Sequence, residues 1–485
     1  MRTSISLLAV LGIFLLLNST EAMGQWINGQ NADLVLGQSS FTSNAFGLGP
    51  DSLFAPTGAV IDPTTGKLFV ADIGNNRVLR WASVDSLVSG QPAEAVLGQP
   101  DFTSDAKRVT QDGMDFPTAI AIDMQGRLYV SDALNNRVLR YDSASAKPSG
   151  ANADGVLGQP DFTSKIDTAS RSGMNYVRGL YADGDGRLWV SDQRNNRVLR
   201  FDNAAAKPNG ADADGVLGQP DFLSNAGDTS QSGMSQPRGL VLDDQGRLWV
   251  AEVFNHRVLR FDNASAKPNG ANADGVLGQP DFTTAIPMTT ASGMSGVSGV
   301  AIDQSGRLYV GDTSNNRILL FNDAVAKPNG GSADGVLGKP DFVTTTAATT
   351  QNGMSGPWGS WVDRVRNTLW VYDTGNNRIL RFTATLPLPV EEAADGIPDR
   401  FALAQNYPNP FNPSTDIGFR IADFGLVRLL VYDLLGREVA VLVNEKKAPG
   451  TYSVQFDASD LGSGVYLYRL QAGNYSETKK LVILR

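Results

Sequence analysis

The chain of 485 residues contains no cysteine and a single histidine, His256. Without cysteine it can form no disulfide bond, no thiol nucleophile and no cysteine-ligated zinc site. Catalytic zinc usually has three protein ligands, commonly including more than one histidine, so a histidine-ligated metal enzyme is not expected. The sequence therefore predicts no metal ion and no other cofactor.

The chain also lacks an excess of basic residues. It has 41 Lys and Arg against 50 Asp and Glu, a formal net charge of -9. This balance gives no support for nucleic-acid binding or for electrostatic attachment to anionic membranes. The 51 glycines are regularly placed, which favours turn-rich β structure over disorder.

Long apolar runs are lacking too, apart from Leu7–Leu17 near the N-terminus. This run follows Arg2, is too short for a membrane-spanning helix of about 20 residues, and is followed by the small residues Ala22 and Gly24. The pattern predicts a signal peptide over residues 1–24 and a protein that leaves the cytoplasm with no membrane span. A buried core helix is the alternative.

Two short markers recur through most of the chain. Copies of "VLGQ", or close variants, begin at Val35, Val96, Val156, Val216, Val276 and Val336. Copies of "NNR" or "NHR" begin at Asn75, Asn135, Asn195, Asn255, Asn315 and Asn376. Successive copies of either marker are 60 or 61 residues apart, so the chain contains six repeats of one supersecondary unit.

Each unit is interpreted as four short antiparallel strands. In one copy these strands are residues 117–123, 126–132, 136–142 and 155–162, separated by turns rich in Gly, Asn and Asp. The second and third runs alternate apolar and polar residues, which is typical of half-buried strands. Six such units predict an all-β fold, a six-bladed β-propeller over residues 25–382.

The repeat begins and ends out of phase. It opens with a lone fourth strand at residues 35–41 and ends with a third strand at residues 377–382. We expect these two segments to pair and close the ring, because pairing removes two exposed sheet edges.

The segment "GRLYVSDALNNRVLRYD" (126–142) resembles an NHL repeat. The resemblance extends over residues 32–382 and implies a six-bladed propeller. Members of this family bind proteins, RNA or glycans, or carry out metal-assisted lyase or hydrolase chemistry. The fold alone does not choose among these activities.

A different composition follows the repeats. Residues 383–400 are rich in proline and acidic residues and are predicted to be a linker. Residues 401–485 contain short strand-like runs typical of a small immunoglobulin-like β-sandwich. The strings "NYPNPFNPST" (406–415), "VYDLLGREVAVLV" (431–443) and "KKLVIL" (479–484) resemble the type A C-terminal sorting domain of the type IX (Por) secretion system of Bacteroidetes-type bacteria.

That resemblance implies export across the outer membrane, with release from the cell or attachment to its surface. It implies the type IX secretion machinery as a partner. A plain carbohydrate-binding or immunoglobulin-like module is the alternative interpretation of residues 401–485.

Every unit has an acidic residue five positions before an arginine, on either side of the turn between its second and third strands (the b–c turn). The pairs are Asp72 and Arg77, Asp132 and Arg137, Asp192 and Arg197, Glu252 and Arg257, Asp312 and Arg317, and Asp373 and Arg378. Six copies of one ion pair indicate a structural role in the turn rather than six active sites.

His256 occupies the second Asn position of the fourth b–c turn, so we interpret it as a turn residue. A role as a single general base is the alternative. The segment "YADGDGRLW" (181–189) resembles part of a calcium loop but lacks further oxygen ligands. It stands at a turn that other units also have, so no metal is assigned to it. No catalytic residue is assigned.

A ligand site should break the six-fold pattern, whereas structural positions should repeat. The variable positions at the start of the first strand and in the b–c turn lie on one face of a propeller and include basic and aromatic residues. The candidate ligand-binding residues are Arg178, Arg194, Arg238, Phe254, His256 and Trp358, with Tyr176 nearby. In an acidic protein this cluster suits an anionic glycan or peptide carboxylates. A solvated rim with scattered charges is the alternative.

These observations favour a secreted or cell-surface binding module for a glycan or protein. The second hypothesis is an extracellular enzyme, a polysaccharide or lactone-type lyase or hydrolase that uses carboxylates on the propeller axis. A third is a structural surface protein.

Overall fold

The computed structural model describes residues 26–384, 401–406, 409, 411, 413–473 and 475–483. The chain divides into two compact units, Met1–Leu386 and Pro387–Arg485. The predicted signal peptide and residues 385–400 of the predicted linker lie outside the described residues.

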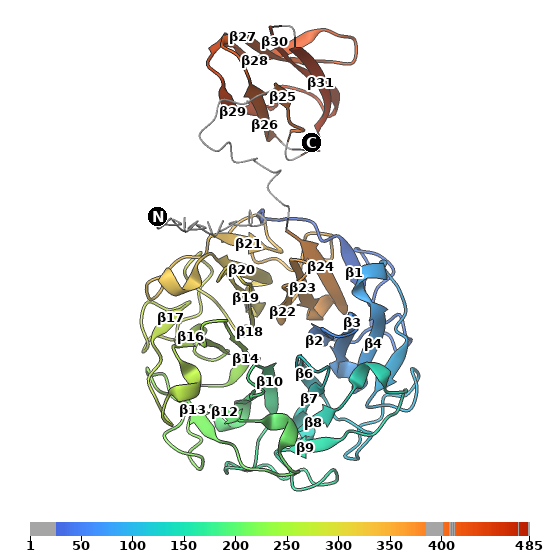
Figure 1. Cartoon of the computed structure of the whole chain (residues 1–485), viewed down its shortest axis with the longest axis vertical. Helices are drawn as coiled ribbons and strands as arrows, with labels where there is room; N and C mark the ends of the chain where they lie inside the picture. The colour runs from blue at the N-terminus through green and yellow to red at the C-terminus, as the bar shows by residue number, and fades with distance from the viewer. Residues whose placement is uncertain are drawn as a thin grey trace, which may run out of the picture. The chain divides into compact units, whose positions relative to one another are not determined.

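The first unit is a ring of six four-stranded antiparallel sheets (Figure 1). The innermost strands are β2 (Pro56–Ile61), β6 (Pro117–Ile122), β10 (Val177–Ala182), β14 (Pro237–Leu242), β18 (Val297–Ile302) and β22 (Gly359–Asp363). The second strands are β3 (Lys67–Asp72), β7 (Leu128–Asp132), β11 (Leu188–Asp192), β15 (Leu248–Glu252), β19 (Leu308–Asp312) and β23 (Thr368–Asp373).

The third strands are β4 (Arg77–Ser83), β8 (Arg137–Tyr141), β12 (Arg197–Phe201), β16 (Arg257–Phe261), β20 (Arg317–Phe321) and β24 (Arg378–Thr383). The outer strands are β5 (Ala95–Leu97), β9 (Gly155–Leu157), β13 (Gly215–Leu217), β17 (Gly275–Leu277), β21 (Gly335–Leu337) and β1 (Leu34–Leu36). The predicted all-β, six-bladed propeller is confirmed.

Short 3-10 helices connect these strands. Those in the b–c turns are η1 (Ile73–Asn75), η3 (Ala133–Asn135), η5 (Gln193–Asn195), η8 (Thr313–Asn315) and η10 (Thr374–Asn376). Those after the third strands are η2 (Val84–Ser86), η4 (Ala144–Ala146), η6 (Ala204–Ala206), η7 (Ala264–Ala266) and η9 (Ala324–Ala326).

The outer strands are shorter than the sequence predicts. The second blade's outer strand ends at Leu157 instead of continuing to residue 162. The next residue, Gly158, has a φ of +86°, which turns the chain out of the sheet and which side-chain-bearing residues rarely adopt. The β1 strand likewise ends at Leu36, before Gly37 at φ +81°.

The predicted ring closure is confirmed. In the sixth blade, β1 pairs antiparallel with β24, with Val35 opposite Leu380. The closure also begins earlier than predicted, because the Asn28 side chain accepts a hydrogen bond from the Val336 N–H at 2.9 Å. Asn209, Asn269 and Asn329 hold the outer strands of three other blades in the same way. Residues 28–36 therefore complete the last repeat.

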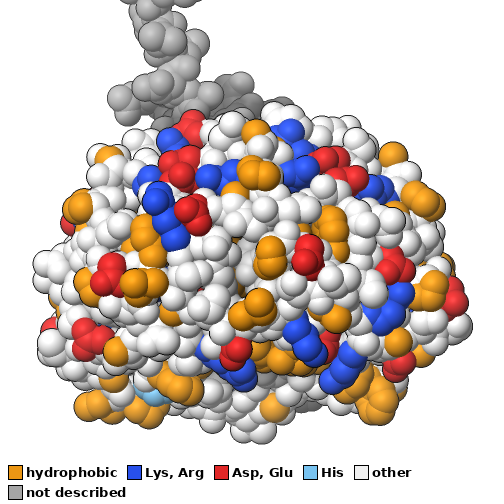
Figure 2. Space-filling model, turned by 90° about the horizontal axis from the view of Figure 1, so that it is seen from below, with side chains coloured by type: hydrophobic (Ala, Val, Ile, Leu, Met, Phe, Trp, Pro, Cys, Tyr) orange, Lys and Arg blue, Asp and Glu red, His pale blue; other side chains and the backbone are white. Residues whose placement is uncertain are grey.

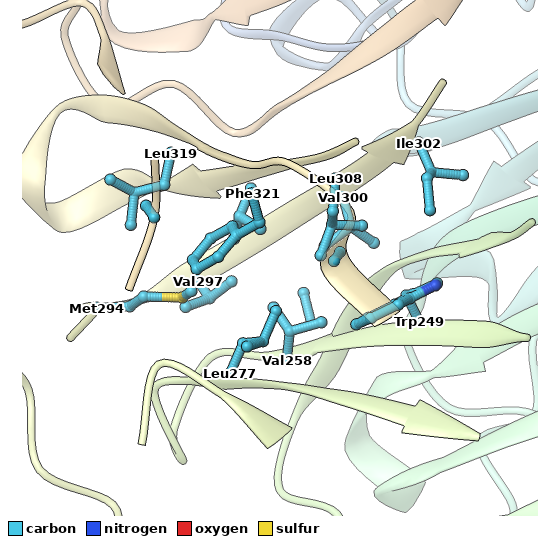
Figure 3. Packing of buried hydrophobic residues seen from close by; sticks show 14 of the residues in the cluster. Trp249, Val258, Leu277, Met294, Val297, Val300, Ile302, Leu308, Leu319 and Phe321 are labelled. Atoms are coloured by element: carbon cyan, nitrogen blue, oxygen red, sulfur yellow. The ribbon is translucent and has the colours of Figure 1, made fainter. Parts of the chain in front are cut away.

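Apolar side chains fill the spaces between blades. Six buried clusters each join two successive blades, and one of them joins the sixth blade to the first through Leu36 and Trp370. Figure 3 shows the cluster between the fourth and fifth blades, where Trp249, Leu277 and Phe321 pack together. Burial of each such side chain contributes roughly 1.5–3 kcal/mol, so the ring is stabilised at every interface.

Glycines allow the innermost strands to approach one another. A Cβ atom added to Gly239 would lie 2.6 Å from the Cα of Gly299, and one added to Gly299 would lie 2.7 Å from the Cα of Gly359. These separations are far below van der Waals contact, so a larger residue here would force neighbouring blades apart.

The second unit has two antiparallel sheets around one apolar core. One sheet contains β25 (Ala402–Leu403), β26 (Ser414–Ile421) and β29 (Gly450–Asp457). The other contains β28 (Glu438–Lys447), β27 (Gly425–Tyr432), β30 (Gly464–Ala472) and β31 (Tyr475–Ile483). Ile417, Leu429 and Leu470 lie in the core between them. This arrangement confirms the predicted small sandwich.

Acidic and basic side chains intermix on the edge of the propeller that Figure 2 shows. Hydrophobic side chains on this face are scattered among them rather than gathered in one wide patch. The part of the chain that the structure describes contains no helix long and apolar enough to cross a membrane.

Candidate ligand site at the axial mouth

Residues at the beginning of the innermost strands, together with the residue just before β22, surround one end of the propeller axis. We call this end the arginine mouth; it is formed by Thr57, Thr118, Arg178, Arg238, Ser298 and Trp358. In the third blade the pairing of β10 with β11 shifts register between Val177 and Gly179, so Arg178 is the extra residue of a β-bulge. A bulge of this kind re-aims a side chain, here toward the axis.

Side chains from opposite blades meet over this mouth. Trp358 belongs to the sixth blade and Arg178 to the third, and their innermost strands β22 and β10 face each other across the ring (Figure 1). The guanidinium carbon of Arg178 lies 4.4 Å from the centre of the Trp358 ring, and that of Arg238 lies 5.1 Å from it. Trp358 is thus in cation–π contact with two arginines.

Two further aromatic rings surround Arg178. Its guanidinium carbon lies 4.6 Å from the ring centre of Tyr176 and 5.6 Å from that of Phe116. Tyr176 (φ +61°) and Phe116 (φ +67°) both adopt the left-handed conformation, which is unusual for bulky residues. The equivalent residues of the other four blades, Ala55, Gln236, Gly296 and Gly356, also have positive φ, so this conformation belongs to the repeat, and what varies is the side chain that it presents.

The third b–c turn completes the cluster. The Nε of Arg178 donates a hydrogen bond to the Gln193 side-chain oxygen at 3.2 Å, and its Nη2 donates to the Tyr176 hydroxyl at 3.1 Å. Arg194 is exposed, and its guanidinium carbon lies 4.3 Å from the Tyr176 ring centre. Arg238 donates to the Ser298 hydroxyl at 2.8 Å.

None of these three arginines has a carboxylate partner among the described residues, and their contacts are with neutral oxygens and aromatic rings. The Nη1 atom of Arg178 and the Nε atom of Arg238 are buried without a hydrogen-bond partner, as is the hydroxyl of Thr57. Burial, together with the positive charges of Arg238 and Arg194, lowers the pKa of Arg178 to about 9. An anion at this position would pair with the cations and relieve that cost.

Behind the arginine mouth lies a cavity of about 600 Å³ that follows the axis of the ring. Its walls are mainly apolar and include Ile120, Leu180, Leu240 and Val300. At the far end Arg364 of the sixth blade forms an ion pair with Asp244 of the fourth. Arg366, which also lines that end, pairs with Asp363 at 3.0 Å and Asp85 at 2.6 Å. Arg364 and Arg366 at the far end therefore have carboxylate partners, whereas Arg178 and Arg238 at the arginine mouth do not.

The repeated Asp–Arg pairs lie elsewhere and are fully buried. In the third blade, Arg197 Nε lies 2.7 Å from Asp192 Oδ2, and both side chains are 0% exposed. Arg197 also donates to the carbonyl oxygens of Ser170, Gly173 and Phe222. The pair thus fastens the b–c turn to two neighbouring loops as well as bracing the hairpin.

The same pair recurs in the other five blades, with no exposure of either side chain. Its members are Asp72 and Arg77, Asp132 and Arg137, Glu252 and Arg257, Asp312 and Arg317, and Asp373 and Arg378.

His256 takes the place of an asparagine in the fourth b–c turn. Its φ is +51°, and its Nδ1 accepts a hydrogen bond from the Gly296 N–H at 2.9 Å. In the third blade the equivalent Asn196 accepts from the Gln236 N–H at 2.8 Å. Burial lowers the pKa of His256, in agreement with an unprotonated, accepting Nδ1.

The structure therefore brings four of the six candidate residues together: Arg178, Arg194, Arg238 and Trp358. Arg178, Arg238 and Trp358 line the cavity, whereas Arg194, which joins the cluster through the Tyr176 ring, does not, and neither do His256 and Phe254. Phe254 is 62% exposed on the b–c turn.

The carboxylates near the axis do not form a metal centre within the described ranges. No group of three or more His, Cys, Asp or Glu residues that could hold a metal ion occurs there. In the segment that resembles a calcium loop, Asp183 Oδ1 accepts hydrogen bonds from the N–H groups of Asp185 and Arg187, and Oδ2 accepts from the Trp189 indole. Asp183 is thus occupied within its own turn.

Sequence reasoning missed Phe116 and Gln193 as parts of the cluster. Phe116 occupies the same position as Tyr176, two residues before the bulge, so the repeat alignment contained a signal for it. The contact of Arg178 with Trp358 was also open to inference, because the third and sixth blades of a six-membered ring are opposite each other. The side-chain conformations that bring Gln193 to Arg178 could not be predicted from the sequence.

Two regions of the chain match known families. Residues 234–261 and 295–321 match the family described as NHL repeat, and residues 405–484 match the family described as secretion system C-terminal sorting domain. The chain therefore combines NHL repeats with a secretion sorting domain, as the sequence resemblances implied. The sorting domain marks the protein for export to the cell surface or the medium. No curated protein matches the chain.

Several solved structures are similar in fold. PorZ, described as an essential bacterial surface component of the type IX secretion system of Porphyromonas gingivalis, is 13% identical, with a TM-score of 0.39. That match covers 89% of this chain and 51% of PorZ, so this chain spans about half the length of PorZ.

A protein of unknown function from Bacteroides thetaiotaomicron is 14% identical over 73% of this chain and 75% of its own, with a TM-score of 0.48. Virginiamycin B lyase from Staphylococcus aureus is 12% identical over 72% of this chain and 98% of its own, with a TM-score of 0.40. Similarity at this level says nothing about ligand or activity.

Proposed function

We propose that this secreted or cell-surface propeller is a binding module, and that the arginine mouth binds an anionic glycan or an acidic protein segment. One observation carries the proposal: Arg178, Arg194 and Arg238 converge without a carboxylate partner at positions where the six-fold repeat is broken. A propeller needs its repeated residues for folding, but it does not need a cluster of unpaired cations.

The domain roles follow from the same proposal. After removal of the signal peptide (1–24), residues 25–382 supply the ligand-binding propeller. The linker (383–400) joins it to residues 401–485, which the type IX secretion machinery recognises during export. The binding face then operates outside the cell, at the surface or in the medium.

The test is an array of acidic and neutral glycans and peptides, probed with the mature chain. The wild type should bind acidic members, and the double variant R178A/R238A should lose at least tenfold in affinity, because each charge-assisted hydrogen bond contributes about 1.5–3 kcal/mol. Arg171→Ala is the matched control, since Arg171 lies on the rim of the same blade and does not line the cavity. Equal binding by wild type and double variant to every acidic member would refute the proposal.

A further inference from the structure

We propose that the axial cavity is a binding chamber for an amphipathic carboxylate, a small molecule with one carboxylate group and a compact apolar body. The carboxylate lies between Arg178 and Arg238, and the apolar body lies in the cavity behind them. This inference rests on the proposed function, because it uses the same arginines. It goes further in naming a ligand that enters the ring rather than one that lies across its face.

The dimensions and walls of the chamber carry the first step. Sites for small organic molecules have volumes of about 300–1,000 Å³ and mainly apolar walls with a few placed polar groups. The axial cavity has about 600 Å³, and successive innermost strands contribute Ile120, Leu180, Leu240 and Val300 to its wall. Tyr181 also lines it, which adds aromatic surface for a planar apolar body.

The polar groups at one end carry the second step. Arg178 Nη1 and Arg238 Nε are buried N–H donors without a partner, and both residues line the cavity. The hydroxyls of Thr57 and Ser360, which also line it, have no hydrogen-bond partner either. A carboxylate accepts several hydrogen bonds through its two oxygens, so it satisfies donors on both arginines at once.

The arginines at the two ends of the cavity differ in whether they have carboxylate partners. Arg364 and Arg366 at the far end already have carboxylate partners, so a ligand carboxylate gains little there. The ligand therefore has a defined direction, with its charge at the arginine mouth. Trp358, which lies against Arg178 and Arg238, covers the bound carboxylate from the axis side.

Burial argues against a long polymer as the principal ligand of these groups. Arg194 is exposed to a polymer lying on the propeller face, whereas Arg178 and Arg238 are only partly exposed and their unpartnered Nη1 and Nε atoms are buried. A small carboxylate that enters the cavity, which both arginines line, pairs with their guanidinium groups and also buries its apolar surface.

The experiment is calorimetric titration of the mature chain with three probes. These are 2-naphthoate, its neutral analogue 2-naphthamide, and polygalacturonate, an anionic polymer too wide to enter. We expect one 2-naphthoate bound per chain, at least tenfold tighter than 2-naphthamide. R178A/R238A should weaken 2-naphthoate binding at least tenfold, and R171A should leave it unchanged.

Cavity-filling variants test the chamber itself. Leu240→Phe and Val300→Phe add bulk at two separate positions of the wall and should each weaken 2-naphthoate binding at least tenfold, whereas Leu240→Met, of similar volume, should not. Polygalacturonate binding, where it occurs, should be unaffected by all three. Thermal melting checks that each variant is folded, and having two filling positions keeps the test decisive if one of them does not fold.

The outcomes separate the two proposals. If 2-naphthoate fails to bind, binds no tighter than 2-naphthamide, or ignores both filling variants, the chamber is refuted. If polygalacturonate still binds in a manner that depends on Arg178 and Arg238, the binding function stands without the chamber. If no anion binds in a manner that depends on these arginines, both proposals are overturned.

Discussion

Arg197 and Arg178 belong to the same blade but lie in opposite electrostatic environments. Arg197 has Asp192 at 2.7 Å and three carbonyl acceptors. Arg178 has only the neutral oxygens of Gln193 and Tyr176 and the faces of aromatic rings. The first environment recurs in all six blades, whereas the second occurs once. Repeated charge therefore maintains the ring, and unrepeated charge remains available to a ligand.

The largest loss of stability should come from breaking one of the repeated acid–arginine ion pairs. Arg197→Ala leaves Asp192 buried without its counter-charge and removes the donors that hold two loops, so the free energy of unfolding should fall by about 3–5 kcal/mol. Chemical denaturation of the full chain measures this loss. Arg194→Ala is the neighbouring control, and its exposed side chain should change stability by no more than about 0.5 kcal/mol. A loss below about 1 kcal/mol for Arg197→Ala would contradict a structural role for the pair.

The β1 strand, which closes the ring, should contribute as much to stability as the outer strand of another blade. Leu36 in β1 and Leu277 in β17 occupy equivalent positions, and both are buried. Replacing either with alanine should cost about 2–5 kcal/mol, because each deletion leaves a cavity between blades. Denaturation of L36A and L277A checks this. A negligible cost for L36A beside a large cost for L277A would show that the N-terminal strand does not close the ring.

Replacing Arg178, whose environment occurs in one blade, should not lower the free energy of unfolding. Arg178→Met replaces a buried, unpaired cation by an apolar side chain of similar length, so stability should stay constant or rise by about 1 kcal/mol while anion binding is lost. Melting temperature and array binding measured on one preparation test both halves. A clear loss of stability would mean that Arg178 is needed for the fold.

The smallest effect concerns His256, and its sign depends on pH. Its folded-state pKa is lowered by burial, so as pH falls below the unfolded value of about 6.5 the unfolded state binds a proton that the folded state does not. The contribution of His256 to the free energy of unfolding is therefore fully present above about pH 6.5 and declines as the pH falls below that value. His256→Asn should match the wild type near pH 8 and become relatively more stable between pH 7 and 5. The melting temperatures of the wild type and His256→Asn are compared at each pH. A difference between them that stays constant from pH 8 to pH 5 would rule out this account.

The sequence predicted the repeated features of the fold well, because each leaves six copies of its pattern. The 60-residue spacing, the acid–arginine pairs and the missing outer strand led to the propeller and its closure. The extension of the closure to Asn28 was visible as well, since "INGQNAD" (27–33) resembles "PNGANAD" (268–274). The outer strands were predicted too long because glycines at positive φ end them after three residues.

The candidate site was less predictable, because it depends on contacts across the axis. Variation among blades selected Arg178, Arg238 and Trp358, which line the cavity, and also Phe254 and His256, which do not. His256 preserves the hydrogen bond of the asparagine it replaces. The size of the cavity depends on how closely the innermost strands pack, which no single residue pattern specifies.

The most direct test of the central claim is a crystal structure of the mature chain with 6-bromo-2-naphthoate. The account predicts a carboxylate between Arg178 and Arg238, with the anomalous peak of the bromine inside the cavity near Leu180 and Leu240. A bromine peak at rim residues such as Arg171, or none at all, would contradict it.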